Sequence, residues 1–142
     1  MKHINRSKVL LILNWCAGKF GQSKFQDSLP KIRIYKSNGC NTIKYYPTGL
    51  CGYYNCTTNT IVIFLGTHCS IKDLCSTVIH EYKHYLQNNS DYEPIYCKLI
   101  SEGKSPMKVS EIHPHEKKCR SAEKKWKDLC YQKLRNKLYT IN

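Results

Sequence analysis

Three features are scarce or missing in this chain of 142 residues: long apolar runs, paired cysteines and acidic side chains. No apolar run approaches the roughly 20 residues of a membrane-spanning helix, so no such helix is predicted. The nine cysteines include no Cys-x-x-Cys pair, which favours free buried thiols in a reducing compartment over a disulfide framework. The spaced group Cys51, Cys56, His68 and Cys69 is interrupted by a strand-like run and matches a structural zinc site poorly.

The shortage of acidic residues leaves a formal net charge of +13. Such an excess favours anionic partners, namely a nucleic acid or an acidic protein surface, and predicts binding that weakens with salt. Many of the basic residues lie near the C-terminus: Lys117, Lys118, Arg120, Lys124, Lys125, Lys127, Lys133, Arg135 and Lys137. They fall opposite an apolar stripe, as the charges of any solvated helix face do. The charge alone therefore does not name a partner.

The most informative pattern is the motif His80-Glu81-x-x-His84 inside a helical apolar run. Ser70, followed three residues later by Asp73, predicts the start of this helix. Its apolar seam comprises Leu74, Cys75, Val78, Ile79, Tyr82 and Leu86. Residues four apart share a helix face, so both imidazoles can reach one ion, on the side away from the seam. The H-E-x-x-H pattern predicts two zinc ligands with Glu81 beside them as general base.

A catalytic zinc needs a third protein ligand, and the segment 111–119 offers three: His113, His115 and Glu116. Pro114 suits the first position of a helix. The apolar stripe of this helix comprises Cys119, Ala122, Trp126, Leu129, Cys130, Leu134 and Leu138. His115 and Glu116 both fall within about 60° of the centre of that stripe. Periodicity therefore does not choose between them.

The segments 76–87 and 113–120 resemble the small zincin-like metallopeptidases encoded by bacteriophages and other viruses, which are related in pattern to the SprT-like and ImmA-like groups. In gluzincin-type members the third ligand is a Glu in a pattern like H-P-x-E-x-E-A-R, and that Glu aligns with Glu116. This chain departs from the pattern at Lys118, where Glu is common, and at Cys119, where Ala is usual. SprT-like proteins proper use a third His, which keeps His113 and His115 as alternatives.

The resemblance implies a zinc-dependent peptidase that hydrolyses peptide bonds with Glu81 as the proton acceptor. A second donor usually holds the developing oxyanion, and Tyr92, Tyr96, His113 and His115 are candidates for it. The alternatives are a protein of the same shape in which zinc is structural, such as a virion component or a nucleic-acid-associated module, and a SprT-like protease that acts on DNA-bound proteins. The expected substrate is a peptide or protein.

The length predicts one domain of the α+β class, a minimal zincin-like fold. We expect an N-terminal helix within 1–22, a small antiparallel or mixed sheet within 30–67 and the motif helix over 70–88. A loop or partly helical excursion over 89–110 and a C-terminal helix over 111–139 follow.

Within these segments, Arg6 to Phe20 shows helical spacing, closed by Gly18 or Gly21. The sheet is predicted from short strands at Ile32 to Ile34 and Ile43 to Tyr45, and from a hairpin of 50–54 with 60–65. The resemblance implies that an edge strand of this sheet lies near the metal and holds an extended substrate by strand addition. No convincing cleavage site follows the N-terminal apolar run, which favours the interior of a host cell or a virion over secretion.

Overall fold

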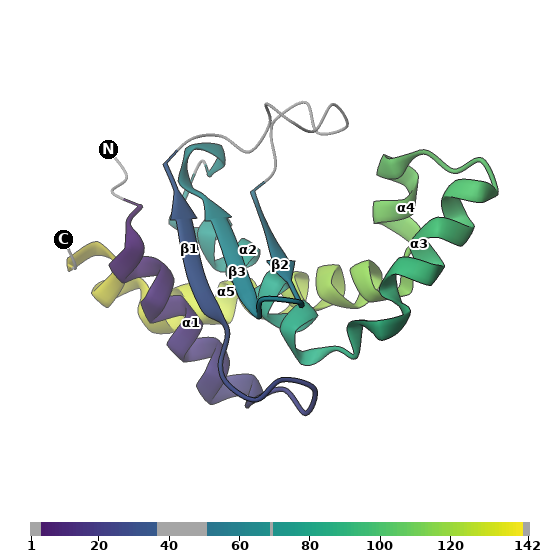
Figure 1. Ribbon diagram of the computed structural model, residues 1–142. Helices are drawn as coiled ribbons and strands as arrows, with labels where there is room; N and C mark the ends of the chain where they lie inside the picture. The colour runs from purple at the N-terminus through teal and green to yellow at the C-terminus, as the bar shows by residue number, and fades with distance from the viewer. Residues whose placement is uncertain (1–3, 37–50, 69, 141–142) are drawn as a thin grey trace.

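The computed structural model describes residues 4–36, 51–68 and 70–140. It combines helices with one three-stranded mixed sheet, which confirms the α+β class (Figure 1). The elements in chain order are α1 (Arg6–Phe20), β1 (Lys31–Tyr35), β2 (Gly52–Asn55), β3 (Thr60–Phe64), η1 (Leu65–Thr67), α2 (Ile71–Leu86), η2 (Asn89–Asp91), α3 (Tyr92–Ser101), α4 (Pro106–Ile112) and α5 (Pro114–Thr140).

The helix α1 has the bounds that its apolar spacing predicts. The side chain of Asn5 accepts a hydrogen bond from the Lys8 N–H at 3.0 Å and caps its first turn. The chain passes through Gly18 and leaves the helix at Gly21, whose φ of 80° lies in the region that glycine adopts without strain. Of the two predicted end points, the structure therefore selects Gly21.

The sheet has the strand order β1-β3-β2, with β1 parallel and β2 antiparallel to β3. The predicted hairpin is confirmed, and the side chain of Asn55 stabilises its turn by accepting hydrogen bonds from the N–H groups of Thr57 and Thr58. In the central strand, Ile61 and Ile63 are fully buried. The strand expected at 43–45 lies outside the described residues.

The edge strand β2 packs directly against α2. Gly52 allows this approach: a Cβ there would lie 2.6 Å from the carbonyl oxygen of Val62 and 3.2 Å from Cγ2 of Thr77 on α2. Any side chain at Gly52 would therefore push β2 away from its neighbours. This packing brings an edge of the sheet next to the helix that carries the motif.

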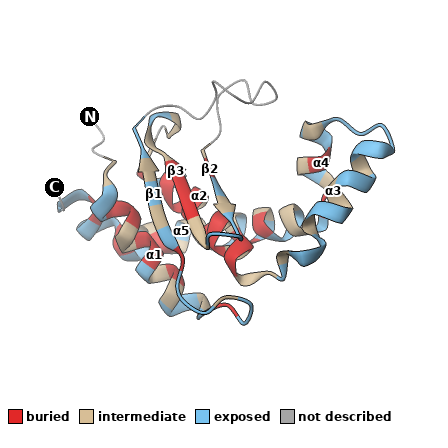
Figure 2. Cartoon of the chain, viewed as in Figure 1, coloured by how far each residue is buried: buried red, intermediate tan, exposed pale blue. Residues whose placement is uncertain are grey.

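The helix α2 is the centre of the fold, with α1, α5 and the sheet packed around it (Figure 1). Ser70 caps it by accepting a hydrogen bond from the Asp73 N–H at 3.0 Å, as predicted. Most of its apolar seam is completely buried. The motif face is covered as well, since Glu81 and His84 are each only 7% exposed. Burial therefore extends around much of α2 instead of being confined to its apolar seam (Figure 2).

Of the two alternatives expected for 89–110, the loop is wrong and the helical excursion is confirmed, because most of this segment is helical in η2, α3 and α4. The Ser, Asn, Gly and Pro residues that suggested a loop stand at helix ends. Ser105 caps α4 by accepting a hydrogen bond from the Lys108 N–H, and Pro106 occupies the first turn. The predicted helix over 111–139 is corrected as well: α5 begins at Pro114, and residues 111–112 belong to α4.

Candidate metal centre

Three side chains from α2 and α5 meet at one point. The Nε2 atom of His80 lies 2.9 Å from Oε1 of Glu116, and the Nε2 atom of His84 lies 3.1 Å from the same oxygen. The two imidazoles stand one helical turn apart on α2, with ring centroids separated by 5.1 Å. Two nitrogen atoms and one carboxylate oxygen, all potential zinc ligands, therefore share one small space.

Glu116 reaches this point because α5 begins at Pro114 and then runs alongside α2. The proline ring fixes φ at a helical value in the first turn, where no backbone N–H is needed. Glu116 consequently lies within the first turn of α5. A carboxylate there is also favoured by the positive end of the helix dipole.

Each of these three side chains is held by a further partner. The second ring nitrogen of His80, Nδ1, lies 3.0 Å from Oε2 of Glu123, and Nδ1 of His84 lies 3.1 Å from Oε1 of Gln87. The hydroxyl of Tyr92 donates to Oε2 of Glu116 at 2.6 Å. Metal-binding histidines commonly use their other ring nitrogen in this way, which fixes the ring orientation and the tautomer.

Sequence reasoning missed Glu123 and Gln87. Helical spacing could have revealed both residues. Gln87 follows His84 by three residues and Glu123 follows Glu116 by seven, so each pair shares one helix face. Gln87 also donates from Nε2 to the carbonyl of His115 at 3.1 Å. It thereby ties the end of α2 to the start of α5.

The structure does not bring His113 or His115 into the cluster of ligand atoms. The His115 N–H donates to Nδ1 of His113, so Nε2 of His113 carries the hydrogen and donates to the carbonyl of Tyr92 at 3.0 Å. Nε2 of His115 lies 2.9 Å from Oδ1 of Asp91. Glu116 is thus the one of the three predicted third ligands that contacts both His80 and His84.

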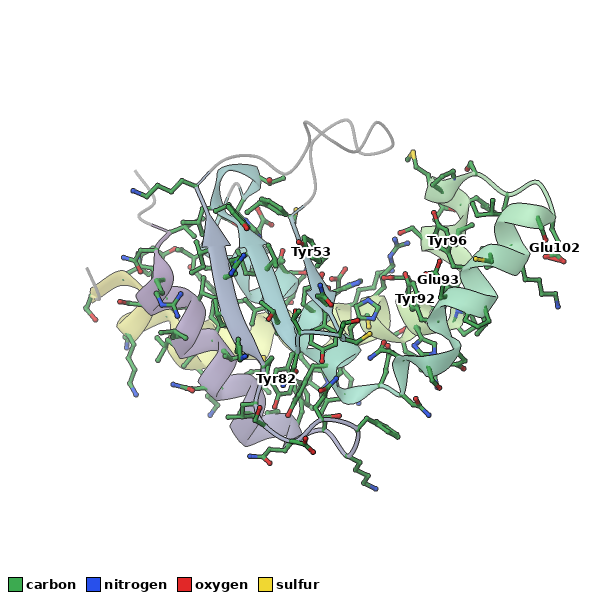
Figure 3. All side chains as sticks on the ribbon, viewed as in Figure 1. Tyr53, Tyr82, Tyr92, Glu93, Tyr96 and Glu102 are labelled. Atoms are coloured by element: carbon green, nitrogen blue, oxygen red, sulfur yellow. The ribbon has the colours of Figure 1, made fainter. Side chains whose placement is uncertain are left out.

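Among the four predicted oxyanion donors, Tyr92 contacts the cluster through its hydroxyl. It lies on α3, on the side that faces the sheet (Figure 3). The Tyr92 ring stacks on the His113 ring, with centroids 4.1 Å apart. The His113 side chain is thus engaged with Tyr92 and not with the two motif histidines. Tyr96 follows one turn later on the same helix (Figure 3).

The electrostatics of the metal-free cluster favour a charged pair. Burial lowers the pKa of His80, but hydrogen bonds to Glu116 and Glu123 outweigh burial and raise this pKa to about 10. Burial raises the pKa of Glu116, yet hydrogen bonds from His80 and His84 hold it well below its usual range. Without a metal, a proton on His80 therefore takes the place of a cation beside Glu116.

Glu81 lies in a different environment from Glu116. Burial raises the pKa of the Glu81 carboxyl, and the neighbouring His80 and His84 counteract this only in part. A carboxyl whose pKa is shifted toward neutrality is suited to accept and return a proton. Two carboxyl groups of one site thus have opposite pKa shifts, as expected for a ligand and a general base.

The donor atoms fit a zinc ion. Bonds of about 2.0–2.1 Å to a tetrahedral ion place its ligand atoms roughly 3.4 Å apart. The two nitrogens lie 2.9 and 3.1 Å from the Glu116 oxygen, so a shift of a few tenths of an ångström would open the cluster enough. A further sulfur lies nearby: the Sγ atom of Cys119 and a ring nitrogen of each motif histidine lie within 4.8 Å of one another.

Comparison of the chain with protein-family models, with curated proteins and with solved structures gave no match. Within the described residues, none of the helices has both the length and the apolar character needed to cross a bilayer.

Proposed function

We propose that this protein is a zinc-dependent metallopeptidase of the H-E-x-x-H type. The observation that supports this most strongly is the convergence of His80, His84 and Glu116, which come from two separate segments, on one point. Three protein ligands of this chemistry are typical of catalytic zinc sites, which keep a further position for solvent or substrate. When bound, zinc would polarise the scissile carbonyl and lower the pKa of water.

In this proposal each side chain of the centre has a separate task. His80, His84 and Glu116 hold the ion, and Glu123 and Gln87 fix the two rings that bind it. Glu81 accepts a proton from the attacking water and returns it to the leaving amine. Burial raises its pKa, which matches this exchange.

Tyr92 is the candidate that we propose to stabilise the oxyanion. Its hydroxyl already reaches the cluster through Glu116 Oε2, and a modest rotation would turn it to a substrate oxygen. Preorganised donors of this kind lower the barrier because they are oriented before charge develops. The side chains of the three proposed ligands are 9–15% exposed, so the cluster is largely covered and a small part of its surface reaches solvent.

The test of catalysis is Glu81→Gln. This variant should bind zinc with unchanged stoichiometry and lose cleavage of a general substrate such as casein, since an amide does not accept the proton. Glu102→Gln is the matched control, because Glu102 is exposed at the far end of α3 (Figure 3) and should leave turnover unchanged. Full activity of Glu81→Gln would refute the assigned role.

A second candidate function is a protein of the same shape with structural zinc, and the position of Cys119 favours it. A fourth ligand from the chain would leave no position for solvent. Metal analysis combined with a cleavage assay, with and without a chelator, separates the two. Cleavage that the chelator abolishes supports the peptidase, whereas bound zinc without cleavage under any condition supports the structural protein.

We also propose a nucleic acid as the partner of α5, as in a protease that acts on nucleic-acid-bound proteins. Most of its basic residues are exposed: Lys117, Lys118, Lys124, Lys125, Lys133, Arg135 and Lys137. Exposed cations along one helix bind a phosphate backbone with a strong dependence on salt. Single-stranded or duplex DNA should stimulate cleavage at low salt. The same assay with an acidic protein in place of DNA tests the alternative partner, an acidic protein surface. No effect of DNA at any salt concentration would remove this partner.

A further inference from the structure

Cys119 differs from the other buried cysteines in the side chains that surround it. It lies on α5 between Glu116 and Glu123, three residues after the first and four before the second, so that all three side chains share one helix face. It is fully buried. Its sulfur and one ring nitrogen each of His80 and His84 lie within 4.8 Å of one another, so that it adds a further potential ligand atom to those of the cluster.

The other buried thiols have a simpler explanation. Cys16, Cys75 and Cys130 belong to the apolar core between α1, α2 and α5, where free cysteine behaves as a small hydrophobic side chain. Packing accounts for these three without any ligand. Cys119 differs from them because two imidazoles and a carboxylate lie on the same side of its helix.

We propose that Cys119 is a fourth protein ligand, which competes with solvent for the zinc ion and makes the resting protein latent. This inference rests on the proposed zinc centre and adds a regulatory feature to it. Thiolate is a preferred ligand of zinc, and Cys-containing sites with four protein ligands are closed. The sulfur and the two imidazole nitrogens already lie within 4.8 Å of one another, so all three are close enough to be considered as ligands of one ion.

The chemistry of closure is a ligand exchange without oxidation. With zinc bound, the thiol of Cys119 would give its proton to solvent, and its sulfur would supply an electron pair as the fourth ligand in place of a water molecule. Opening is the reverse: a water molecule or a substrate carbonyl replaces the sulfur, which takes up a proton. Closure and opening therefore require only the exchange of one ligand and one proton, with no oxidant or reductant.

The direct test is X-ray absorption spectroscopy of the wild-type protein loaded with one equivalent of zinc. A sulfur neighbour at about 2.3 Å, together with nitrogen and oxygen neighbours, is expected. This measurement needs no variant and so does not depend on whether a variant folds. A first shell of nitrogen and oxygen alone would overturn the proposal while leaving the zinc centre intact.

Variants then identify the sulfur. Cobalt(II) in place of zinc should give a thiolate charge-transfer band in the wild type that disappears in Cys119→Ala, with one cobalt still bound. Cys130→Ala is the matched control, since Cys130 is also buried on α5 but belongs to the core. Its band should persist. Loss of the band in both variants, or in neither, would overturn the assignment to Cys119.

The same variants separate this inference from the proposed function. If Cys119 competes with solvent, zinc-loaded Cys119→Ala should cleave casein severalfold faster than the wild type, whereas Cys130→Ala should match the wild type. Equal rates of Cys119→Ala and wild type would overturn latency. Absence of any stoichiometric metal, in a wild-type protein shown to be folded by circular dichroism, would overturn the proposed zinc centre and this inference with it.

Discussion

The carboxylate of Glu123 lies 3.0 Å from Nδ1 of His80, on the ring nitrogen opposite the one that faces Glu116. His80 is thus held between two carboxylates that stand two turns apart on α5. This arrangement leaves the ring one orientation, in which Nε2 points at the ligand cluster. It also makes Glu123 a positioning residue for His80 in the proposed metal centre, although nothing in the motif itself indicates it.

Removal of Glu123 should therefore weaken zinc binding. Glu123→Ala is expected to lower zinc affinity by roughly 10–100-fold, the usual effect of losing such a supporting group. Glu123→Gln, which keeps an acceptor oxygen, should lie between this variant and the wild type. Competition with a chromophoric chelator measures the affinities. Asp128→Asn is the control, because Asp128 lies on the same helix as Glu123 but forms an exposed ion pair with Lys72 of α2, so this variant should bind zinc normally.

The identity of the third ligand leads to a second prediction. Glu116→Ala should lose stoichiometric zinc, an effect larger than that of Glu123→Ala, because it removes an oxygen that contacts both motif histidines. His115→Ala should retain one zinc per chain, since the His115 ring is engaged with Asp91 instead. Metal content after gel filtration gives the answer. Loss of zinc in His115→Ala, together with one zinc per chain retained in Glu116→Ala, would make His115 the third ligand.

The raised pKa of His80, about 10, predicts that His80 releases about one proton near neutral pH when zinc binds, and the Cys119 thiol would release a second proton if it is the fourth ligand. A metal must displace the proton that His80 carries, so zinc affinity should rise as the pH increases toward that value. In the metal-free protein the sign is opposite: the stability that His80 contributes is complete below pH 6.5, the ordinary pKa of His, and is lost as the pH rises through about 10. Calorimetry in buffers of different ionisation enthalpy counts the protons. Heats that do not depend on the buffer would contradict this.

Gly52 provides a prediction about the fold that does not depend on any metal. Gly52→Ala should lower the free energy of unfolding by about 1–3 kcal/mol, because its Cβ would meet the Val62 carbonyl oxygen and Thr77. Gly18→Ala is the opposite case. Gly18 lies inside α1 with open space around it, so alanine there should stabilise the protein by up to about 1 kcal/mol. Urea unfolding of the two variants tests this difference in sign.

Local patterns predicted the elements well wherever the signal lies within one turn or one hairpin. The cap at Ser70 and the apolar seam of α2 depend on neighbours three or four residues away, and the Asn55 turn depends on residues within it. For the segment 89–110 the sequence predicts no more than a loop or a partly helical excursion, for a related reason. Its Ser, Asn, Gly and Pro residues are common both in loops and at helix ends, and composition alone does not separate the two.

The sequence by itself determined that His80 and His84 share a face and that Glu81 stands between them, because the pitch of a helix fixes the directions of residues four apart. It did not decide between Glu116 and His115, which lie on the same side of α5. Tertiary structure decided which of them contacts the motif: Asp91 engages His115, Tyr92 stacks on His113, and the packing of α5 along α2 brings Glu116 to both histidines. Contacts between residues more than thirty positions apart depend on how helices pack, which no local periodicity encodes.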